Sequence, residues 1–108
     1  MAQSYEYTYL LDLAAQAEDS MMRLAYITAF MITSNTVAEK SIGKPFNPLL
    51  HETYELKTDK FRFLAEMVSH HPPVAAVHCV GQDWEVWTNC KTNVSFNGKN
   101  ITAKQQFR

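Results

Sequence analysis

Apolar residues near the N-terminus recur at the three- and four-residue spacing of an amphipathic helix. This pattern predicts a helix over residues 4 to about 17, a stretch that contains neither glycine nor proline. The apolar positions that define its face are Tyr7, Leu10, Leu11 and Ala14. Tyrosines also alternate at positions 5, 7 and 9, so a strand is the alternative for these first residues.

A second helix is expected from about Met21 to Ala38, after a break and capping signal at Glu18-Asp19-Ser20. Its apolar residues form a wide face, which predicts a helix packed into the core. The residues of this face are Met22, Leu24, Ile27, Phe30 and Met31.

The pattern changes after Gly43-Lys44-Pro45, where the helical part ends. Pro45 and Pro48 restrict the backbone of KPFNP and predict an extended, turning loop. Short segments of strand-like composition follow, with turn signals between them. The segments are ETYEL, FRFLAEM, VAAVHCV, DWEVWTN, NVSFNG and KNITAK. Successive strands joined by short turns predict an antiparallel meander.

Turns are expected at Thr58-Asp59, at residues 81–83 and at Asn97-Gly98. The last is the strongest hairpin signal, for a type I′ turn with positive φ at both residues. The predicted fold class is α+β, in one domain with residues 1–40 helical and residues 41–108 β-rich. No partner is visible for the last strand, so we expect a larger sheet or one half of an assembly, in which self-association through the open edge is possible.

Composition narrows the function. The chain has 108 residues, a net charge of -1 and 46% hydrophobic residues, which argues against a general nucleic-acid binder. Cys79 and Cys90 match no zinc or redox spacing, and we expect no cofactor or metal. The N-terminus lacks the basic region of a signal peptide, and the apolar run of residues 24–32 is far shorter than the roughly 20 residues that span a bilayer. We therefore expect a cytoplasmic protein.

The segment EMVSHHPP, residues 66–73, carries the first candidate chemistry. Neighbouring side chains of a strand point to opposite faces, so His70 and His71 can serve one ligand only on a non-strand backbone. Pro72 and Pro73 favour such a backbone, a strand end that turns sharply. Two imidazole donors there suit a phosphate with several acceptor oxygens. A surface turn with solvated histidines is an equal alternative, whereas a zinc site or a serine–histidine pair fits poorly.

A second candidate segment is KPFNPLLHETYEL, residues 44–56. Lys44 precedes a rigid proline loop, and its ammonium is a good point-charge partner for phosphate. Asn47 offers amide donors and a carbonyl acceptor. The alternative is a loop with a solvated lysine, and neither segment is decisive by itself.

Together the two segments resemble the fingerprints of the oxysterol-binding protein family, EQVSHHPP and KPFNPLLGETYE, in the same order. The helical stretch of residues 23–48 is similar to the region that leads into the family's barrel. The resemblance implies an incomplete antiparallel β-barrel around a lipid tunnel. It also implies non-vesicular lipid transfer between membranes at contact sites, with a sterol, another lipid or phosphatidylinositol 4-phosphate as cargo. The implied head-group residues are Lys44, Asn47, His70 and His71.

The strands also offer aromatic residues for an apolar tunnel lining, although packing in the core is the commoner role for each. They are Phe61, Phe63, Trp84 and Trp87. Two positions depart from the family pattern: Met67 replaces a glutamine, and His51 replaces a glycine. A glycine there serves a special backbone angle or a close approach, in which case His51 strains the loop; the alternative is that His51 adds a further donor near the site. The family domain is several times longer, so we expect the N-terminal part of the barrel, as a fragment or a short relative.

Three functions follow from these observations. The first is a lipid carrier that contacts membranes peripherally, at endoplasmic reticulum or Golgi contact sites. The second is a phosphoinositide-binding module without transfer activity. The third, an enzyme, is not expected, because the chain contains no metal-ligand spacing and no nucleophile motif.

Overall fold

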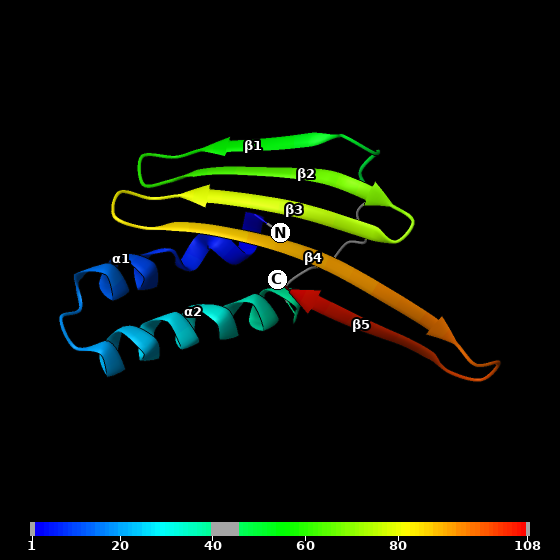
Figure 1. The fold of residues 1–108 in the computed structure, drawn as a ribbon, viewed down its shortest axis with the longest axis horizontal. Coiled ribbons are helices and arrows are strands. Elements are labelled where there is room, and N and C mark those ends of the chain that lie inside the picture. The colour runs from blue at the N-terminus through cyan, green and yellow to red at the C-terminus, as the bar shows by residue number, and fades with distance from the viewer. Residues whose placement is uncertain (1, 40–45, 108) are drawn as a thin grey trace. The chain divides into compact units, whose positions relative to one another are not determined.

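The computed structural model describes residues 2–39 and 46–107, and it has the expected helices followed by an antiparallel sheet (Figure 1). The helical elements are η1 (Ala2–Tyr7, a 3-10 helix), α1 (Tyr9–Gln16) and α2 (Ser20–Glu39). The strands are β1 (Thr53–Lys57), β2 (Arg62–His70), β3 (Pro73–Val80), β4 (Glu85–Phe96) and β5 (Ile101–Phe107). The α+β fold class is therefore confirmed.

The chain divides into two compact units. The helical unit comprises Met1–Phe46 and the turn Gly81–Trp84, and the sheet unit comprises Asn47–Val80 and Glu85–Arg108. None of the helices among the described residues is both long enough and apolar enough to cross a bilayer.

The single helix predicted over residues 4 to about 17 is divided into two elements, η1 and α1, with Thr8 between them. This residue is buried, and its carbonyl accepts the N–H groups of Leu11 at 2.9 Å and Asp12 at 3.2 Å. The residues at this junction are tyrosines and a threonine, which are weak helix formers because the helix restricts their χ1 angles. A short 3-10 turn before the α-helix fits that composition.

The start of the second helix is as expected. The side chain of Asp19 accepts a hydrogen bond of 3.1 Å from the N–H of Met22, which is the interaction of an N-cap residue. This bond satisfies one of the N–H groups that the first turn of a helix leaves without a partner. The predicted capping signal is therefore confirmed.

The expected apolar face of α2 is only partly buried. Phe30 packs against Tyr5, with ring centroids 5.8 Å apart and a T-shaped geometry. Met22, Leu24, Ile27 and Met31, by contrast, are between 40% and 58% exposed. The prediction of a core helix is wrong for these four side chains, because apolar residues surround the helix and one packing surface cannot cover them all.

The turn Gly81–Trp84 belongs to the helical unit. The indole N–H of Trp84 donates a hydrogen bond of 2.6 Å to the carboxylate of Asp12 on α1. The backbone N–H of Gly81 donates to the carbonyl of Trp84 at 2.9 Å and closes the turn. Asp12 thereby meets the hydrogen-bonding need of a half-buried indole.

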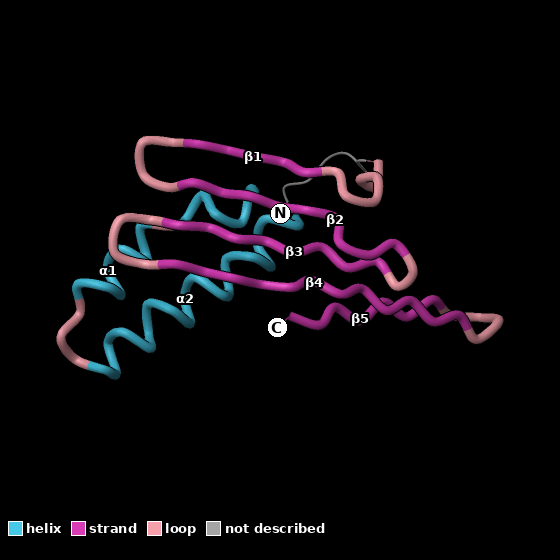
Figure 2. The backbone as a smooth tube through the Cα atoms, turned by 45° about the horizontal axis from the view of Figure 1, so that its top comes forward, coloured by secondary structure: helices cyan, strands magenta, loops and turns pink. Residues whose placement is uncertain are grey.

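The sheet has the order β1-β2-β3-β4-β5 and every neighbouring pair is antiparallel, so the predicted meander is confirmed (Figure 2). One expectation changes, because DWEVWTN and NVSFNG are parts of the single strand β4. Its residues 85–91 pair with β3, and its residues 90–96 pair with β5. No glycine or proline interrupts β4, so the strand continues while its partner changes.

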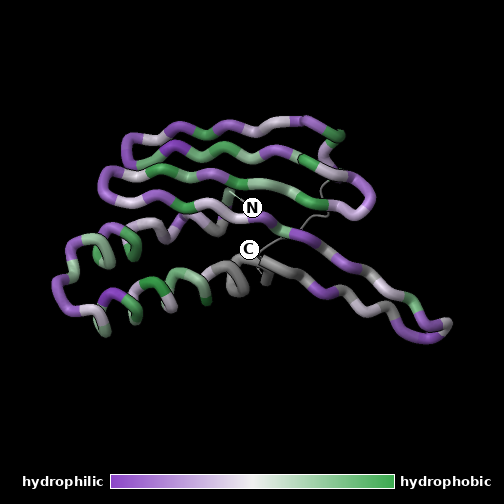
Figure 3. The backbone as a smooth tube through the Cα atoms, in the orientation of Figure 1, coloured by the Kyte–Doolittle hydropathy of each residue, from purple (hydrophilic) through white to green (hydrophobic). Residues whose placement is uncertain are grey.

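Hydrophobic and hydrophilic residues alternate along parts of the strands (Figure 3). Because successive side chains of a strand point to opposite faces of the sheet, the two faces differ in character. The packed face carries four buried side chains, Phe63, Met67, Val77 and Cys79. The open face carries Leu64, Val80 and Trp87, of which Trp87 is the most accessible at 66% exposed. The register supports this division, since Phe63 lies opposite Cys79 and Leu64 lies opposite His78.

The β4–β5 hairpin forms where expected but with a different turn. Gly98 has a φ of 86°, whereas Asn97 does not adopt positive φ, so the predicted type I′ turn is wrong. The side-chain oxygen of Asn97 instead accepts the N–H groups of Lys99 at 3.3 Å and Asn100 at 2.9 Å. The amide thus acts as a local acceptor that closes the turn.

Alkaline pH should destabilise the chain through Cys79. Burial raises the pKa of this thiol from its ordinary value of 9.0 to about 11. Because the unfolded thiol ionises first, the stabilising contribution is complete below about pH 9 and is lost as the pH rises to about 11. We expect this residue to lower the free energy of unfolding by about 2 kcal/mol over that interval.

Denaturant titrations from about pH 8 to about pH 11 measure this loss. The Cys79→Ala variant should show a weaker pH dependence than the unsubstituted chain. Cys90→Ala is the matched control and should keep the Cys79 contribution. Equal pH dependence in the unsubstituted chain and Cys79→Ala would contradict the assignment.

Candidate functional site

The two candidate segments meet at one end of the sheet unit. Figures 1 and 2 show the loop that enters β1 at the same end as the turn between β2 and β3. Asn47 lies on this loop and is exposed, and His70 and His71 lie at the turn. Lys44 is outside the described residues. The structure therefore places three of the four predicted site residues at one end of one sheet.

The histidine pair lies where the strand ends. His70 is the last residue of β2, His71 is in the turn, and the bond from His71 to Pro72 is cis. The two imidazoles are in contact, with centroids 4.6 Å apart and ring planes inclined by 63°. Both side chains are exposed, so both have nitrogen atoms available to a ligand. The predicted non-strand backbone after the strand is present.

An irregularity in β2 precedes the histidines. Met67 pairs with Ala75 but Ser69 pairs with Val74, so Val68 is an extra residue in the ladder. A bulge of this kind shifts the alternation of side chains by one position. His70 therefore does not continue the alternation set earlier in the strand.

The upstream loop contains a closed four-residue turn. The N–H of Leu49 donates to the Glu52 carboxylate at 2.6 Å, and the N–H of Glu52 donates to the carbonyl of Leu49 at 3.0 Å. His51, the third residue of the turn, has a φ of 66°. This left-handed conformation suits glycine and disfavours a side chain. Glycine adopts this conformation without steric cost, so residue 51 has a backbone angle of the special kind that was one of the expectations for this position.

Both departures from the family pattern lie in one contact between the loop and β2. The N–H of His51 donates to the carbonyl of Met67 at 2.8 Å, and the N–H of Met67 donates to the carbonyl of Glu52 at 3.1 Å. The His51 ring also lies 3.2 Å from the Glu66 carboxylate. Met67 is buried, where a thioether needs no hydrogen-bond partner and an amide would.

The aromatic residues expected to line a tunnel take different positions. Phe63 is on the packed face, 6.2 Å from the ring of Tyr54, and Trp84 is bonded to Asp12 in the helical unit. Phe61 is half-buried at the start of β2. Trp87 alone among these four is largely exposed on the open face, where its ring is stacked on His78.

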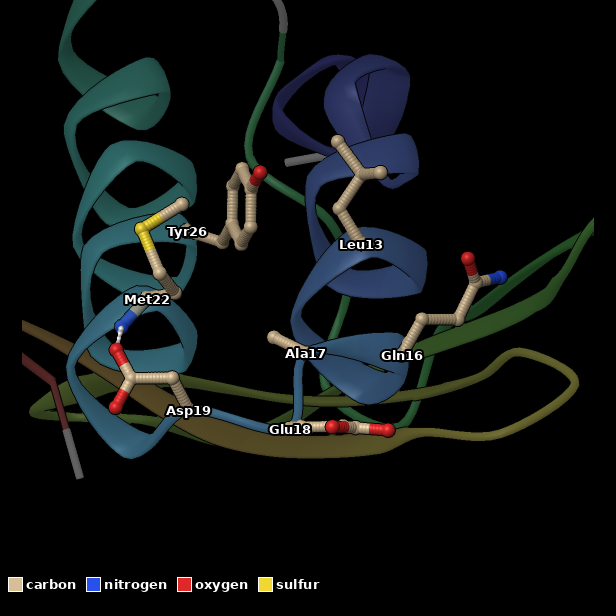
Figure 4. A pocket seen from close by; sticks show the side chains of 7 residues that line it. All are labelled: Leu13, Gln16, Ala17, Glu18, Asp19, Met22 and Tyr26. Atoms are coloured by element: carbon tan, nitrogen blue, oxygen red, sulfur yellow. Dashed lines mark hydrogen bonds between the residues drawn. The ribbon is translucent and has the colours of Figure 1, made fainter.

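A hollow lies in the helical unit, where α1 turns into α2 (Figure 4). Its volume is about 360 Å³, and Leu13 and Tyr26 contribute apolar walls from the two helices. Leu13 and Met22 at its rim are 40% and 49% exposed, so the hollow is open to solvent. Its charged lining residues are the carboxylates Glu18 and Asp19, and none of its lining residues is a histidine. Within the described ranges no cluster of histidine, cysteine or carboxylate residues is suited to a metal ion.

Comparison with known sequences identifies relatives over almost the whole chain. A sequence model described as oxysterol-binding protein matches residues 1–106. Oxysterol-binding protein homolog 2 of Saccharomyces cerevisiae is 42% identical over 106 residues, which cover 96% of this chain and 8% of that protein. Human oxysterol-binding protein-related protein 7 is 39% identical over 104 residues, or 94% of this chain and 12% of that protein.

Solved structures share the fold. The Osh1 ORD domain in complex with ergosterol matches with a TM-score of 0.87 and 38% identity, over 98% of this chain and 26% of that chain. The Osh3 ORD of Saccharomyces cerevisiae in complex with PI(4)P matches with a TM-score of 0.82 and 34% identity, over 98% of this chain and 29% of that chain. This chain thus spans about a quarter of these solved structures.

Substitutions at His51 test the geometry of the loop. At positive φ, glycine avoids a steric cost that alanine retains, so His51→Gly should exceed His51→Ala in stability by about 1 kcal/mol. His51→Asn should fall between them, because asparagine tolerates this conformation better than alanine. The free energy of unfolding from denaturant titration is the measurement. Equal stability of the glycine and alanine variants would show that residue 51 has ordinary backbone angles.

Proposed function

Because this chain belongs to the oxysterol-binding protein family, we propose that it contributes the head-group end of a lipid-transfer domain. The head group is that of phosphatidylinositol 4-phosphate, and the second cargo is a sterol. Related domains have been solved with ergosterol, with cholesterol and with PI(4)P, which supports both ligands. The protein acts in the cytoplasm, at the surfaces of the membranes between which it moves lipid.

The observation that carries this proposal is the contact between His70 and His71 at the end of the sheet. Two imidazoles inclined to one another direct N–H groups along different lines, as a phosphate with several oxygens requires. Asn47 adds an amide from the neighbouring loop, and Lys44 adds a positive charge. We assign the head group to these four residues.

The contacts of Met67 with His51 and Glu52 support the assignment. They hold the loop after Asn47 beside β2, three residues before the histidines. A head group bound between two loops needs a fixed distance between them, and backbone hydrogen bonds supply one without depending on side-chain rotamers. Preorganisation of this kind lowers the entropic cost of binding.

The second candidate function is a membrane-bound module that recognises the head group without extracting the lipid. The open face of the sheet favours it, because Trp87 remains 66% exposed there in this part of the domain. A lipid tail that leaves the membrane must be shielded from water, at about 25 cal/mol per Å² of apolar surface. Pairing of a second copy with the edge of the sheet would provide one such shield.

Alanine at both His70 and His71 should abolish extraction of phosphatidylinositol 4-phosphate, because the phosphate loses its imidazole donors. The chain is incubated with phosphatidylcholine vesicles that contain this lipid, the vesicles are sedimented, and lipid in the supernatant is counted by mass spectrometry. Extraction by the unsubstituted chain supports a carrier. Histidine-dependent sedimentation without extraction supports the membrane-bound module.

Two controls make this result specific. Circular dichroism of the double variant should be unchanged, since both side chains are exposed. The exposed Lys60, in the turn between β1 and β2, provides a control variant, Lys60→Ala, that should extract as much lipid as the unsubstituted chain. If the folded double-alanine variant still binds the lipid, the head group is not held by these histidines.

Lys44→Ala should weaken binding most at low ionic strength. Salt screens the attraction between a lysine ammonium and a phosphate. The Debye length falls from about 30 Å at 0.01 M to about 8 Å at 0.15 M ionic strength. Affinity for vesicles with phosphatidylinositol 4-phosphate is measured at both salt concentrations, with Lys60→Ala as the charge-matched control. Equal affinities for the two lysine variants at low salt would exclude Lys44 from the site.

A further inference from the structure

The turn between β4 and β5 contains Asn97-Gly98, the one place in the sequence where glycine follows asparagine. Both residues are exposed, and so are Phe96 before them and Lys99 after them. Water therefore reaches every group of the turn, as it does at most loop tips. An asparagine in such a position can lose its side-chain amide by reaction with its own backbone.

The backbone nitrogen of Gly98 is available as the nucleophile for that reaction. Its N–H has no hydrogen-bond partner among the described residues, whereas the N–H of Asn97 donates to the carbonyl of Asn100 at 3.2 Å. The φ angle of Gly98 is 86°, and a Cβ atom built on this residue would meet no heavy atom within 4 Å. Because glycine has no side chain, nothing shields this nitrogen.

The side-chain carbonyl of Asn97 is polarised by two donors. Its oxygen accepts the N–H groups of Lys99 at 3.3 Å and Asn100 at 2.9 Å. Attack on the amide carbon gives this oxygen a negative charge, and hydrogen bonds to a charged oxygen are stronger than those to a neutral one. The turn therefore favours the transition state over the intact amide, as the donors of an oxyanion hole do.

The same two hydrogen bonds orient the amide. They hold the Asn97 side chain toward the residues that follow it, which is the direction in which the Gly98 nitrogen lies. Two reacting groups held on one side of the backbone lose less entropy when they join than two groups that move freely. The turn thus supplies an accessible nucleophile, a polarised carbonyl and a restricted approach between them.

We propose that Asn97 is a site of spontaneous deamidation that the β4–β5 turn activates. The Gly98 nitrogen forms a bond to the Asn97 amide carbon and gives up its proton. The bond from that carbon to the amide nitrogen breaks, and this nitrogen leaves as ammonia. Water then opens the five-membered succinimide at either carbonyl, which yields aspartate or isoaspartate without any oxidant or reductant.

The modification changes the charge of the hairpin. Residues 86–107 contain three lysines, Lys91, Lys99 and Lys104, and no aspartate or glutamate. Either product introduces the first carboxylate of this segment, next to the exposed tip. Aspartate keeps an acceptor for the N–H groups of Lys99 and Asn100, whereas isoaspartate adds one carbon to the backbone of the turn. The isoaspartate product should therefore disturb the hairpin more than the aspartate product.

Incubation of the whole purified chain in neutral buffer tests the site. Samples taken over time are digested and analysed by mass spectrometry, and isoaspartate is detected by enzymatic methylation. Asn97 should convert while Asn100 stays intact. Asn100 is the matched internal control because it is exposed in the same turn but precedes Ile101, whose β-branched side chain crowds the attacking nitrogen. Equal conversion of the two asparagines, or conversion of neither, would overturn the site.

A second comparison tests activation by the turn. A synthetic peptide of residues 94–101 has the same neighbours without the fold, and the chain should convert about threefold to tenfold faster than this peptide. That range lies well below the effect of such donors in a water-excluded site, because the turn is exposed. Slower conversion in the chain than in the peptide would overturn activation by the turn.

Gly98→Ala identifies the nucleophile. The alanine side chain crowds the attacking nitrogen in the chain and in the peptide alike, so conversion should slow in both. The peptide comparison is independent of any effect of the substitution on folding, which positive φ disfavours in the chain. An unchanged rate in the Gly98→Ala peptide would exclude attack by the nitrogen of residue 98.

Discussion

Two backbone hydrogen bonds at Met67 determine where the upstream loop lies. They join Met67 to His51 and Glu52, just beyond the last paired residues of β1 and β2. One residue later the ladder contains its bulge, and the strand then ends in the histidine turn. The loop contact, the bulge and the turn therefore follow each other between Met67 and His71. A change in the register of this short stretch would move both candidate segments together.

Local sequence patterns predicted the helices and strands, whereas pairing between strands determined where the strands begin and end. The capping signal at Asp19 involves residues three apart, so the sequence contains all the information it needs. The continuity of β4 depends instead on pairing first with β3 and then with β5, which no local pattern records. The turn at Asn97 is a second feature that the local pattern did not predict correctly. The Asn97 side chain competes with the backbone for the turn, and the choice of acceptor sets the turn type.

The residues of the candidate site could be proposed from the sequence, but the contacts that hold the loop beside β2 could not. The resemblance identified Asn47, His70 and His71, and the structure brings them to one end of the sheet. The resemblance did not identify the hydrogen bonds that His51 makes with Glu66 and Met67. These bonds depend on the register of the strands and on the left-handed backbone of His51. Glu66, next to Met67 in the sequence, is one residue from which the contact with the loop could have been expected. Glu66 lies opposite Thr53 in the ladder, so its carboxylate is within reach of the loop before β1.

His51 also shows why the loop tolerates a residue that its backbone disfavours. A side chain at positive φ costs about 1 kcal/mol, and the bond from the imidazole to exposed Glu66 offsets only a small part of this. The larger compensation is in the main chain, where His51 donates to Met67 and Glu52 closes the turn with Leu49. These bonds involve backbone groups and the Glu52 side chain, so they are available to any residue at position 51 except proline, which has no backbone N–H. The loop geometry is therefore a property of the turn and of β2, and the imidazole is an addition to it.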